Sequence, residues 1–277
     1  MNRYCSAALL ALLLAVTANA QENENSDHEV MLLEQVASQS GDDASITASD
    51  EKNATQQMVD VIVERTNKFR REKGLTAVER DKKLTATARD FARYMARTGK
   101  YGHRADGSRP AQRAADHDYD YCLVAENIAY YFNPDDLEAP EYADWFVDGW
   151  IDSKGHRENM LNKHVTQTGV GVARHDPSGY LFAVQLFGRP TSEHVEFQVI
   201  NKAGKEVAYR LLQDGESKKF TLPARAGMSH TRCFAPQISL ESGKPLRVER
   251  GAEYSIRAGD SGVELEKKAG QDRDPSR

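Results

Sequence analysis

The sequence predicts an α/β domain followed by a small all-β domain. Three amphipathic helical segments come first, and a β-hairpin at about residues 168–187 follows them. Beyond Pro190 the helical period disappears, and short alternating runs are separated by turn residues at intervals of about 8–12 residues, which is typical of a sandwich or barrel. At 277 residues the chain has room for one or two domains of ordinary size.

Each predicted helix has an apolar face and a recognisable end. The first covers residues 56–73, where apolar side chains recur every three or four positions until Gly74 ends the pattern. The second follows Asp81 and ends at Gly99, and the alanines on its apolar face predict close packing against a neighbour. The third runs from about Pro140 to Ser153.

The hairpin consists of residues 168–173 and 180–187, joined across the turn-forming residues 176–179. Its second strand is apolar at nearly every position, as expected where helices cover both faces of a sheet. The later alternating runs place a small β domain at residues 191–263 and leave a charged, frayed tail at 264–277.

The N-terminus has the layout of a secretory signal peptide. Arg3 precedes an apolar run from Ala7 to Ala18, and a small-residue cleavage site ends at Ala20. The run is shorter than the roughly 20 residues that a helix needs to cross a bilayer, so it predicts no transmembrane anchor. We therefore expect residues 1–20 to be removed and the mature chain to be secreted, into the periplasm or the extracellular space.

Charge is unevenly distributed along the chain. Residues 21–51 contain nine acidic residues and no Lys or Arg, so residues 21–55 are predicted to be a flexible acidic leader. Outside residues 21–51, and without Arg3, 36 basic residues stand against 33 acidic ones. That balance gives no electrostatic case for binding nucleic acid.

Three side chains are candidates for chemistry. His103 follows the second helix, His156 follows the third, and Glu126 lies between them in an apolar stretch. A buried carboxylate is costly unless it is paired, so Glu126 should have a cationic, metal or hydrogen-bonding partner. The three groups could bind a divalent metal such as Zn²⁺ or act as acid and base, or the histidines could simply join loops. Arg109 and Arg113 either line the loop beside these groups or lie on the surface.

The order of several short motifs resembles that of a known family. These motifs are Asn67-x-x-Arg70, Gly102-His103, Ala125-Glu126-Asn127-Ile128, Trp150, Gly155-His156-Arg157-x-Asn159, Gly169-Val-Gly-Val172 and Gln185-x-Phe187. In this order they resemble the CAP domain of cysteine-rich secretory proteins, antigen 5 and pathogenesis-related 1 proteins, in its bacterial branch.

The resemblance implies an α-β-α sandwich over residues 56–190 with a central cleft. In this family two histidines and two glutamates line the cleft and can hold a divalent metal. The resemblance implies that His103, Glu126 and His156 occupy three of these four positions. The fourth position departs from the family pattern, because Ser153 replaces the glutamate and Asp152 stands beside it. With Asn127, these residues form the predicted cleft set, and any metal bound there should be held weakly.

Two functions follow from the resemblance. In the first, the exported domain binds a lipid, glycan or protein of the cell envelope. In the second, His103, His156 and Glu126 activate water to hydrolyse an envelope peptide or ester; a water route is the only plausible one, since no serine or cysteine is convincingly placed as a nucleophile.

Export would remove Cys5 and leave Cys122 and Cys233. In an oxidising compartment two thiols commonly form a disulfide, which here would join the β domain to the segment before Glu126. The alternative is two buried thiols that behave as small apolar side chains.

Overall fold

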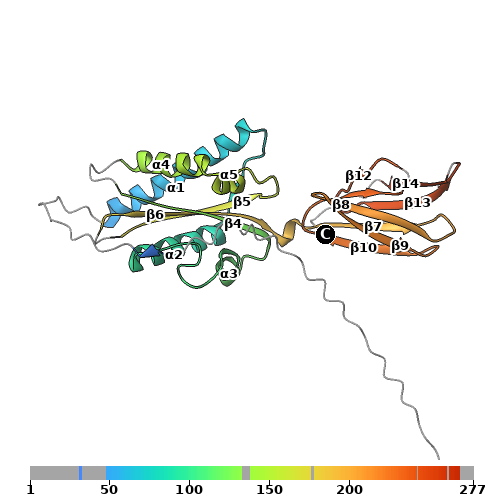
Figure 1. The fold of residues 1–277 in the computed structure, drawn as a ribbon, viewed down its shortest axis with the longest axis horizontal. Helices are drawn as coiled ribbons and strands as arrows, with labels where there is room; N and C mark the ends of the chain where they lie inside the picture. Colours follow the sequence, from blue (N-terminus) through green and yellow to red (C-terminus); the bar gives the residue numbers. More distant parts are fainter. Residues whose placement is uncertain are drawn as a thin grey trace, which may run out of the picture.

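The computed structural model describes residues 31–32, 48–132, 138–175, 178–241, 243–260 and 262–268. The helices gather in one part of the molecule, and a purely β part lies beside it along the long axis (Figure 1). The predicted signal peptide, most of the predicted leader and the end of the predicted tail lie outside the described residues. No helix among the residues described is both long and apolar enough to cross a membrane.

A four-stranded sheet forms the centre of the first domain. Its strands run in the order β2 (Glu79–Arg80), β5 (Gln167–Arg174), β6 (Leu181–Pro190) and β4 (Tyr121–Tyr131). β5 and β6 pair antiparallel, as the predicted hairpin requires, and β4 pairs antiparallel with the other side of β6. β4 is therefore an edge strand.

Helices cover both faces of this sheet (Figure 1). On one side lie α1 (Ala48–Glu72), α4 (Ala139–Asp152) and α5 (Lys154–Met160), and on the other lie α2 (Lys82–Thr98) and α3 (Pro110–Asp116). Each layer has its own apolar core: Phe146 and Trp150 are fully buried in the first, and Leu84 and Met95 in the second. The predicted α/β fold is confirmed.

Local sequence signals explain the bounds of α2. The Asp81 side chain accepts hydrogen bonds from the backbone of Lys83 and Leu84, which caps the first turn. At the other end, Gly99 adopts the left-handed conformation with φ 66° that ends many helices.

Two features correct the prediction of a flexible leader up to residue 55. α1 begins at Ala48, and the short strand β1 (Met31–Leu32) pairs with β3 (Lys100–Tyr101). Ala54 packs against the same core as Met58, four positions later, so the apolar stripe of α1 extends one turn further than predicted.

The second domain is a sandwich of two four-stranded sheets. The first has the order β10 (Gly227–Arg232), β7 (Val195–Asn201), β13 (Glu253–Gly259) and β14 (Gly262–Lys268). The second has the order β12 (Leu246–Arg247), β11 (Gln237–Ser239), β8 (Val207–Gln213) and β9 (Glu216–Leu222). Side chains from both sheets, including Val199 and Tyr209, form one core.

β14 corrects the predicted start of the frayed tail at residue 264. Val263 and Leu265 pack against the core of the sandwich, while Glu266 pairs with Arg257 on the outside at 3.0 Å. This alternation holds the segment up to Lys268 in the sheet although most of its side chains are charged.

Several contacts join the two domains. A disulfide links Cys122 to Cys233, and the next residue, Phe234, is buried in the apolar core of the first domain. The Arg189 side chain donates to the Cys233 carbonyl at 3.0 Å. A cavity of about 670 Å³ lies between the Lys163–His164 loop and residues of β8, β9, β11 and β12.

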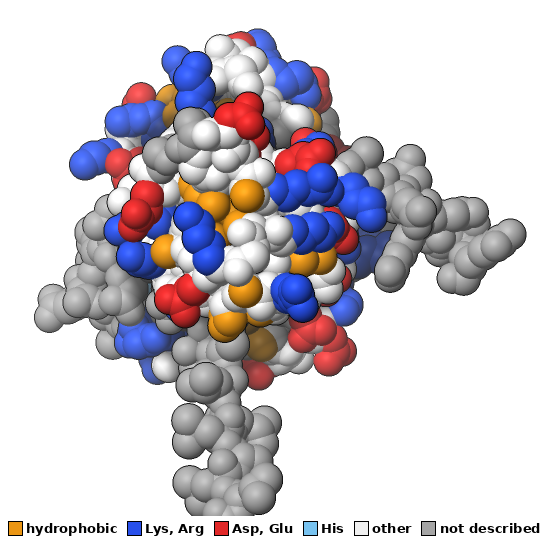
Figure 2. Space-filling model, turned by 90° about the vertical axis from the view of Figure 1, so that its right-hand side faces the viewer, with side chains coloured by type: hydrophobic (Ala, Val, Ile, Leu, Met, Phe, Trp, Pro, Cys, Tyr) orange, Lys and Arg blue, Asp and Glu red, His pale blue; other side chains and the backbone are white. Residues whose placement is uncertain are grey.

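The β-domain end of the molecule carries charges of both signs. Lys and Arg side chains alternate there with Asp and Glu, and apolar side chains are visible between them (Figure 2). This face therefore lacks the clustered positive charge that favours a nucleic-acid backbone.

Candidate functional site

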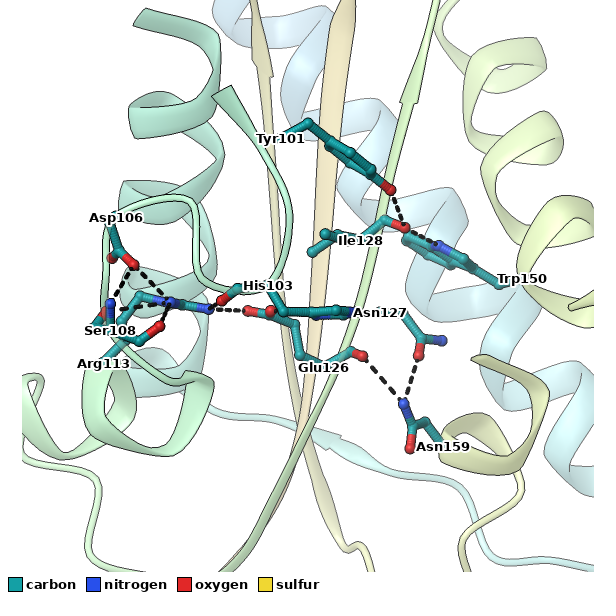
Figure 3. Close-up of polar contacts among 10 residues, drawn as sticks. All are labelled: Tyr101, His103, Asp106, Ser108, Arg113, Glu126, Asn127, Ile128, Trp150 and Asn159. Atoms are coloured by element: carbon teal, nitrogen blue, oxygen red, sulfur yellow. Dashed lines mark hydrogen bonds and ion pairs between the residues drawn. The ribbon is translucent and has the colours of Figure 1, made fainter. Parts of the chain in front are cut away.

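The candidate site lies along β4, where the two helical layers meet at the edge of the sheet. Successive side chains of a strand point to opposite faces. Glu126 accordingly points toward the layer of α2 and α3, and Asn127 points toward α4 and α5 (Figure 3). We call His103, Arg113, Glu126, Asn127 and Asn159 the β4 site.

The Glu126 carboxylate is fully buried and has two partners. Arg113 Nη2 donates to Oε2 at 2.7 Å, and His103 Nδ1 lies 2.8 Å from Oε1. The Glu126 side chain is 0% exposed, compared with 8% for Arg113 and 24% for His103. An ionised carboxylate can only accept, so His103 donates to it from Nδ1, and in a neutral ring this tautomer makes Nε2 the acceptor.

Arg113 is held from several sides. Its Nη1 donates to Asp106 Oδ1, at 3.0 Å, and to the carbonyl and hydroxyl of Ser108. Its Nη2 also donates to the His103 carbonyl at 3.1 Å. The guanidinium carbon lies 3.5 Å from the centre of the Phe91 ring. Arg113 Nε is a buried donor without a hydrogen-bond partner among the described residues, and the stacked ring compensates part of that cost.

A second network occupies the opposite face of β4. Asn127 Nδ2 donates to the backbone carbonyl of His156 at 3.1 Å, which ties α5 to the strand. Asn159 Nδ2 donates to Asn127 Oδ1 at 2.9 Å and to the Glu126 carbonyl at 3.1 Å. Asn159 thus satisfies a backbone acceptor that an edge strand would otherwise leave unpaired.

The next outward carbonyl of the edge strand, that of Ile128, receives two donors. Tyr101 Oη, from β3, and Trp150 Nε1, from α4, each donate to it at 3.2 Å (Figure 3). Burial is the main reason that the pKa of the Tyr101 hydroxyl is raised, so the group stays protonated and remains a donor.

The structure brings together some of the predicted site residues. His103 and Glu126 are in direct contact, and Asn127 contacts the backbone of His156. Ser153 separates α4 from α5, and Asp152 is exposed at the last position of α4. Of the two arginines, Arg113 lines the site, whereas Arg109 is exposed at the N-cap of α3.

The residues present do not fit a divalent metal. Among the described residues, no group of three or more His, Cys, Asp or Glu side chains lies in a position to hold one. Both oxygens of Glu126 are engaged, one of them by a guanidinium whose positive charge would repel a bound cation. The expected triad of His103, Glu126 and His156 is thus replaced by a carboxylate between an arginine and a histidine.

The sequence motifs include Asn159 and Trp150, but neither of them nor Tyr101 was predicted to act in the site. Asn159 lies three residues after His156 in a short helix, and Asn127 lies in an apolar strand earlier in the chain. In the sequence, these two asparagines are only a weak signal of a shared network. Its meaning depends on the pairing of α5 with β4, which only the folded chain shows.

Comparison with known proteins agrees with the fold. A sequence profile of the family described as CAP, the cysteine-rich secretory protein family, matches residues 63–187. The uncharacterized protein YkwD of Bacillus subtilis is 31% identical over 130 residues, which is 46% of this chain and 46% of its own length. The uncharacterized membrane protein YlbC of the same organism is 31% identical over 115 residues, 41% of this chain and 31% of its own. The match therefore spans less than half the length of these curated relatives.

Solved structures are similar at lower identity. An extracellular protein containing an SCP domain from Bacillus anthracis is 24% identical with a TM-score of 0.45, covering 53% of this chain and 45% of its own. An outer surface protein of Borrelia burgdorferi is 22% identical with a TM-score of 0.42, and the match covers 48% of this chain and 93% of that protein. The family match over residues 63–187, on a sheet covered by helices on both faces, identifies this part of the chain as a CAP domain.

Proposed function

We propose that this chain is an exported protein that binds an envelope or extracellular ligand through the β4 site of its CAP domain. Support for export comes from the signal-peptide layout of residues 1–20. The similar proteins of Bacillus anthracis and Borrelia burgdorferi are described as extracellular and outer-surface proteins. Sequencing the N-terminus of the exported protein tests this part: we expect it to begin at Gln21, and a chain that still begins at Met1 would contradict it.

The observation that carries the binding proposal is the full burial of Glu126. Its side chain is 0% exposed and both oxygens already accept hydrogen bonds, so a ligand meets His103 and not the carboxylate. In this arrangement Glu126 orients the imidazole through Nδ1, the side chain is 24% exposed, and Nε2 is the ring nitrogen that we propose a ligand meets. A group with an O–H or N–H to donate, as glycans, lipid headgroups and peptides have, is a suitable partner for Nε2.

The disulfide supports a fixed role for the β domain. Cys122 opens the buried part of β4, four residues before Glu126, and its bond to Cys233 restrains the two domains against each other. We propose that the β domain forms a rigid wall beside the ligand site or holds a second part of the same ligand.

The binding proposal can be tested by recovering the ligand. The mature protein would be purified from its native export route, and bound molecules would be identified by mass spectrometry of the intact complex. We expect a lipid, glycan or peptide to be recovered with the wild type and depleted in His103→Ala. The variant His117→Ala is a matched control, because it removes a partly exposed histidine that pairs with Asp90 outside the site. Equal recovery from all three proteins would contradict the proposal.

A hydrolase is the second candidate, and the contact between His103 and Glu126 favours it. A carboxylate bound to Nδ1 is the arrangement that orients a histidine as a general base toward water. If the chain is a hydrolase, Glu126→Gln should lose turnover of an envelope peptide or ester while it stays folded. If it only binds, the recovered ligand should be chemically unchanged after long incubation with the wild type.

A further inference from the structure

We infer that the guanidinium of Arg113 takes the place of a metal ion in this CAP domain, as the permanent internal counter-ion of Glu126. This inference goes beyond the proposed function, because it holds whether the site binds a ligand or hydrolyses one. Its chemical consequence is a site in which Glu126 has a charged partner and His103 is oriented without any divalent cation.

The first argument is the number of contacts that fix Arg113. Asp106, Ser108 and the His103 carbonyl accept from its terminal nitrogens, in addition to Glu126. The ring of Phe91 covers its face at 3.5 Å. A side chain held in this way, with 8% of its surface exposed, is part of the buried structure and not a mobile surface arginine.

The second argument is electrostatic. A divalent ion bound to His103 and Glu126 would lie within a few ångströms of the guanidinium, where two like charges repel strongly in a buried site. To make room, Glu126 would have to give up Arg113 and leave this buried cation with Asp106 as its remaining carboxylate partner. Asp106 also binds Arg113, so its carboxylate is drawn into the same ion-pair network.

The third argument is geometric. Glu126 and Asn127 leave opposite faces of β4, and Asn127 is the residue that contacts α5, the helix of His156 (Figure 3). The side of the strand to which Glu126 points is the side of α3, which supplies Arg113. The backbone alternation therefore directs the carboxylate toward the arginine.

The inference predicts that removal of Arg113 frees the Glu126 carboxylate to share a zinc ion with His103, with water completing the coordination. We would titrate the mature full-length protein with zinc chloride by isothermal calorimetry, using wild type, Glu126→Gln, Arg113→Met and Arg113→Met/Glu126→Gln. Other histidines can bind zinc and give background heat. The measured quantity is therefore the difference in binding heat between each protein and its Glu126→Gln counterpart. In the wild type we expect no binding heat that depends on Glu126. In Arg113→Met we expect at least a tenfold gain in zinc affinity, and the added Glu126→Gln should abolish this gain.

Two further variants make the test sharper. Arg104→Met removes an exposed charge from the residue next to His103 and should bind zinc like the wild type. Arg113→Lys keeps a positive charge in place and should also gain no affinity. If Arg113→Met does not fold, the comparison of wild type with Glu126→Gln and the result for Arg113→Lys still decide the matter.

Two outcomes would overturn the inference. One is stoichiometric zinc binding by the wild type that is lost in Glu126→Gln, since the site would then accept a metal beside the arginine. The other is a folded Arg113→Met protein whose zinc affinity equals that of the wild type. A chelator provides an independent check: EDTA should leave the thermal midpoint of the wild type unchanged.

Discussion

Cys122, the second residue of β4, is bonded to Cys233 in the β domain, with 5.4 Å between their Cα atoms. The bond spans 111 residues of sequence and joins the strand that carries Glu126 to the loop that buries Phe234 in the core of the CAP domain. Around it, Asp214 of the β domain pairs with Lys163 at 3.0 Å and with His164 at 3.2 Å. Burial opposes ionisation of Asp214, but these two partners outweigh it and hold the pKa of the carboxyl below its usual value.

Loss of the disulfide should destabilise the protein and loosen the second domain. A closed loop of 111 residues corresponds to at most about 4–5 kcal/mol in the chain-entropy model. We expect Cys122→Ser/Cys233→Ser to lower the unfolding midpoint and to raise hydrogen exchange around residues 233–234. Non-reducing alkylation and intact mass of the unfolded wild type provide the direct check, and two alkylated cysteines in freshly exported protein would refute the bond.

Prediction from sequence worked best where the cause of a structure is local. Asp81 and Gly99 mark the ends of α2 because one side chain caps the first turn and one backbone adopts a positive φ. The hairpin of β5 and β6 follows from two apolar runs around a turn. The expectation that Glu126 needs a partner rested on the cost of burying a charge, which does not depend on the fold.

Prediction failed where partners come from distant segments. β4 is apolar on both faces apart from Glu126 and Asn127, so its side chains do not alternate between apolar and polar and the sequence did not reveal a strand. Arg113 is 13 positions from Glu126 and Asn159 is 33, and only the placement of α3 and α5 against the edge strand brings them together. The metal expectation came from residue types and from the family resemblance, and neither shows that Arg113 engages Glu126.

Two glycines of β5 set the distance between the sheet and α2. A Cβ on Gly169 would lie 2.1 Å from the backbone carbon of Leu84, and one on Gly171 would lie 2.3 Å from the Cα of Arg89. Because backbone cannot move aside as a side chain can, we expect Gly169→Ala and Gly171→Ala to lose roughly 3 kcal/mol or more. Gly149→Ala is the matched control: it has open space within α4 and should gain up to about 1 kcal/mol. Urea denaturation compares the three, and similar midpoints would contradict the close packing.

The buried pair of Glu126 and Arg113 should show strong coupling. Glu126→Gln removes one of the two carboxylate partners of the buried guanidinium and leaves Asp106, so the loss should be at most the roughly 3–5 kcal/mol that breaking a buried pair costs. Arg113→Met/Glu126→Gln should lose less than the sum of the single variants, and denaturant unfolding of all four proteins measures the difference. Glu158→Gln serves as control, because its pair with Lys154 is exposed at 3.9 Å and should be worth less than about 1 kcal/mol. Additive losses would argue against the pair.

His230 should make the β domain sensitive to acid. The residue is 4% exposed, its ring Nε2 lies 2.6 Å from Tyr209 Oη, and its Nδ1 lies 3.5 Å from Arg232 Nη2. Burial, followed by the charges of Arg232 and Lys218, lowers the pKa of His230 from 6.5 to about 4. Since Arg232 can only donate, Nδ1 accepts and the neutral ring donates from Nε2 to the tyrosine.

The direction of the pH effect follows from linkage. Below pH 6.5 the unfolded chain takes a proton on His230 that the folded chain refuses until about pH 4, so stability falls as the pH drops through this window. The loss should be on the order of 1–3 kcal/mol. His230→Gln keeps a donor for Tyr209 but cannot titrate, so its thermal midpoint should fall less between pH 6.5 and 4 than that of the wild type. His194→Gln, which changes a partly exposed histidine paired with Glu196, should behave like the wild type. A histidine at position 230 that titrates near pH 6.5 by NMR would show that the ring is not held neutral.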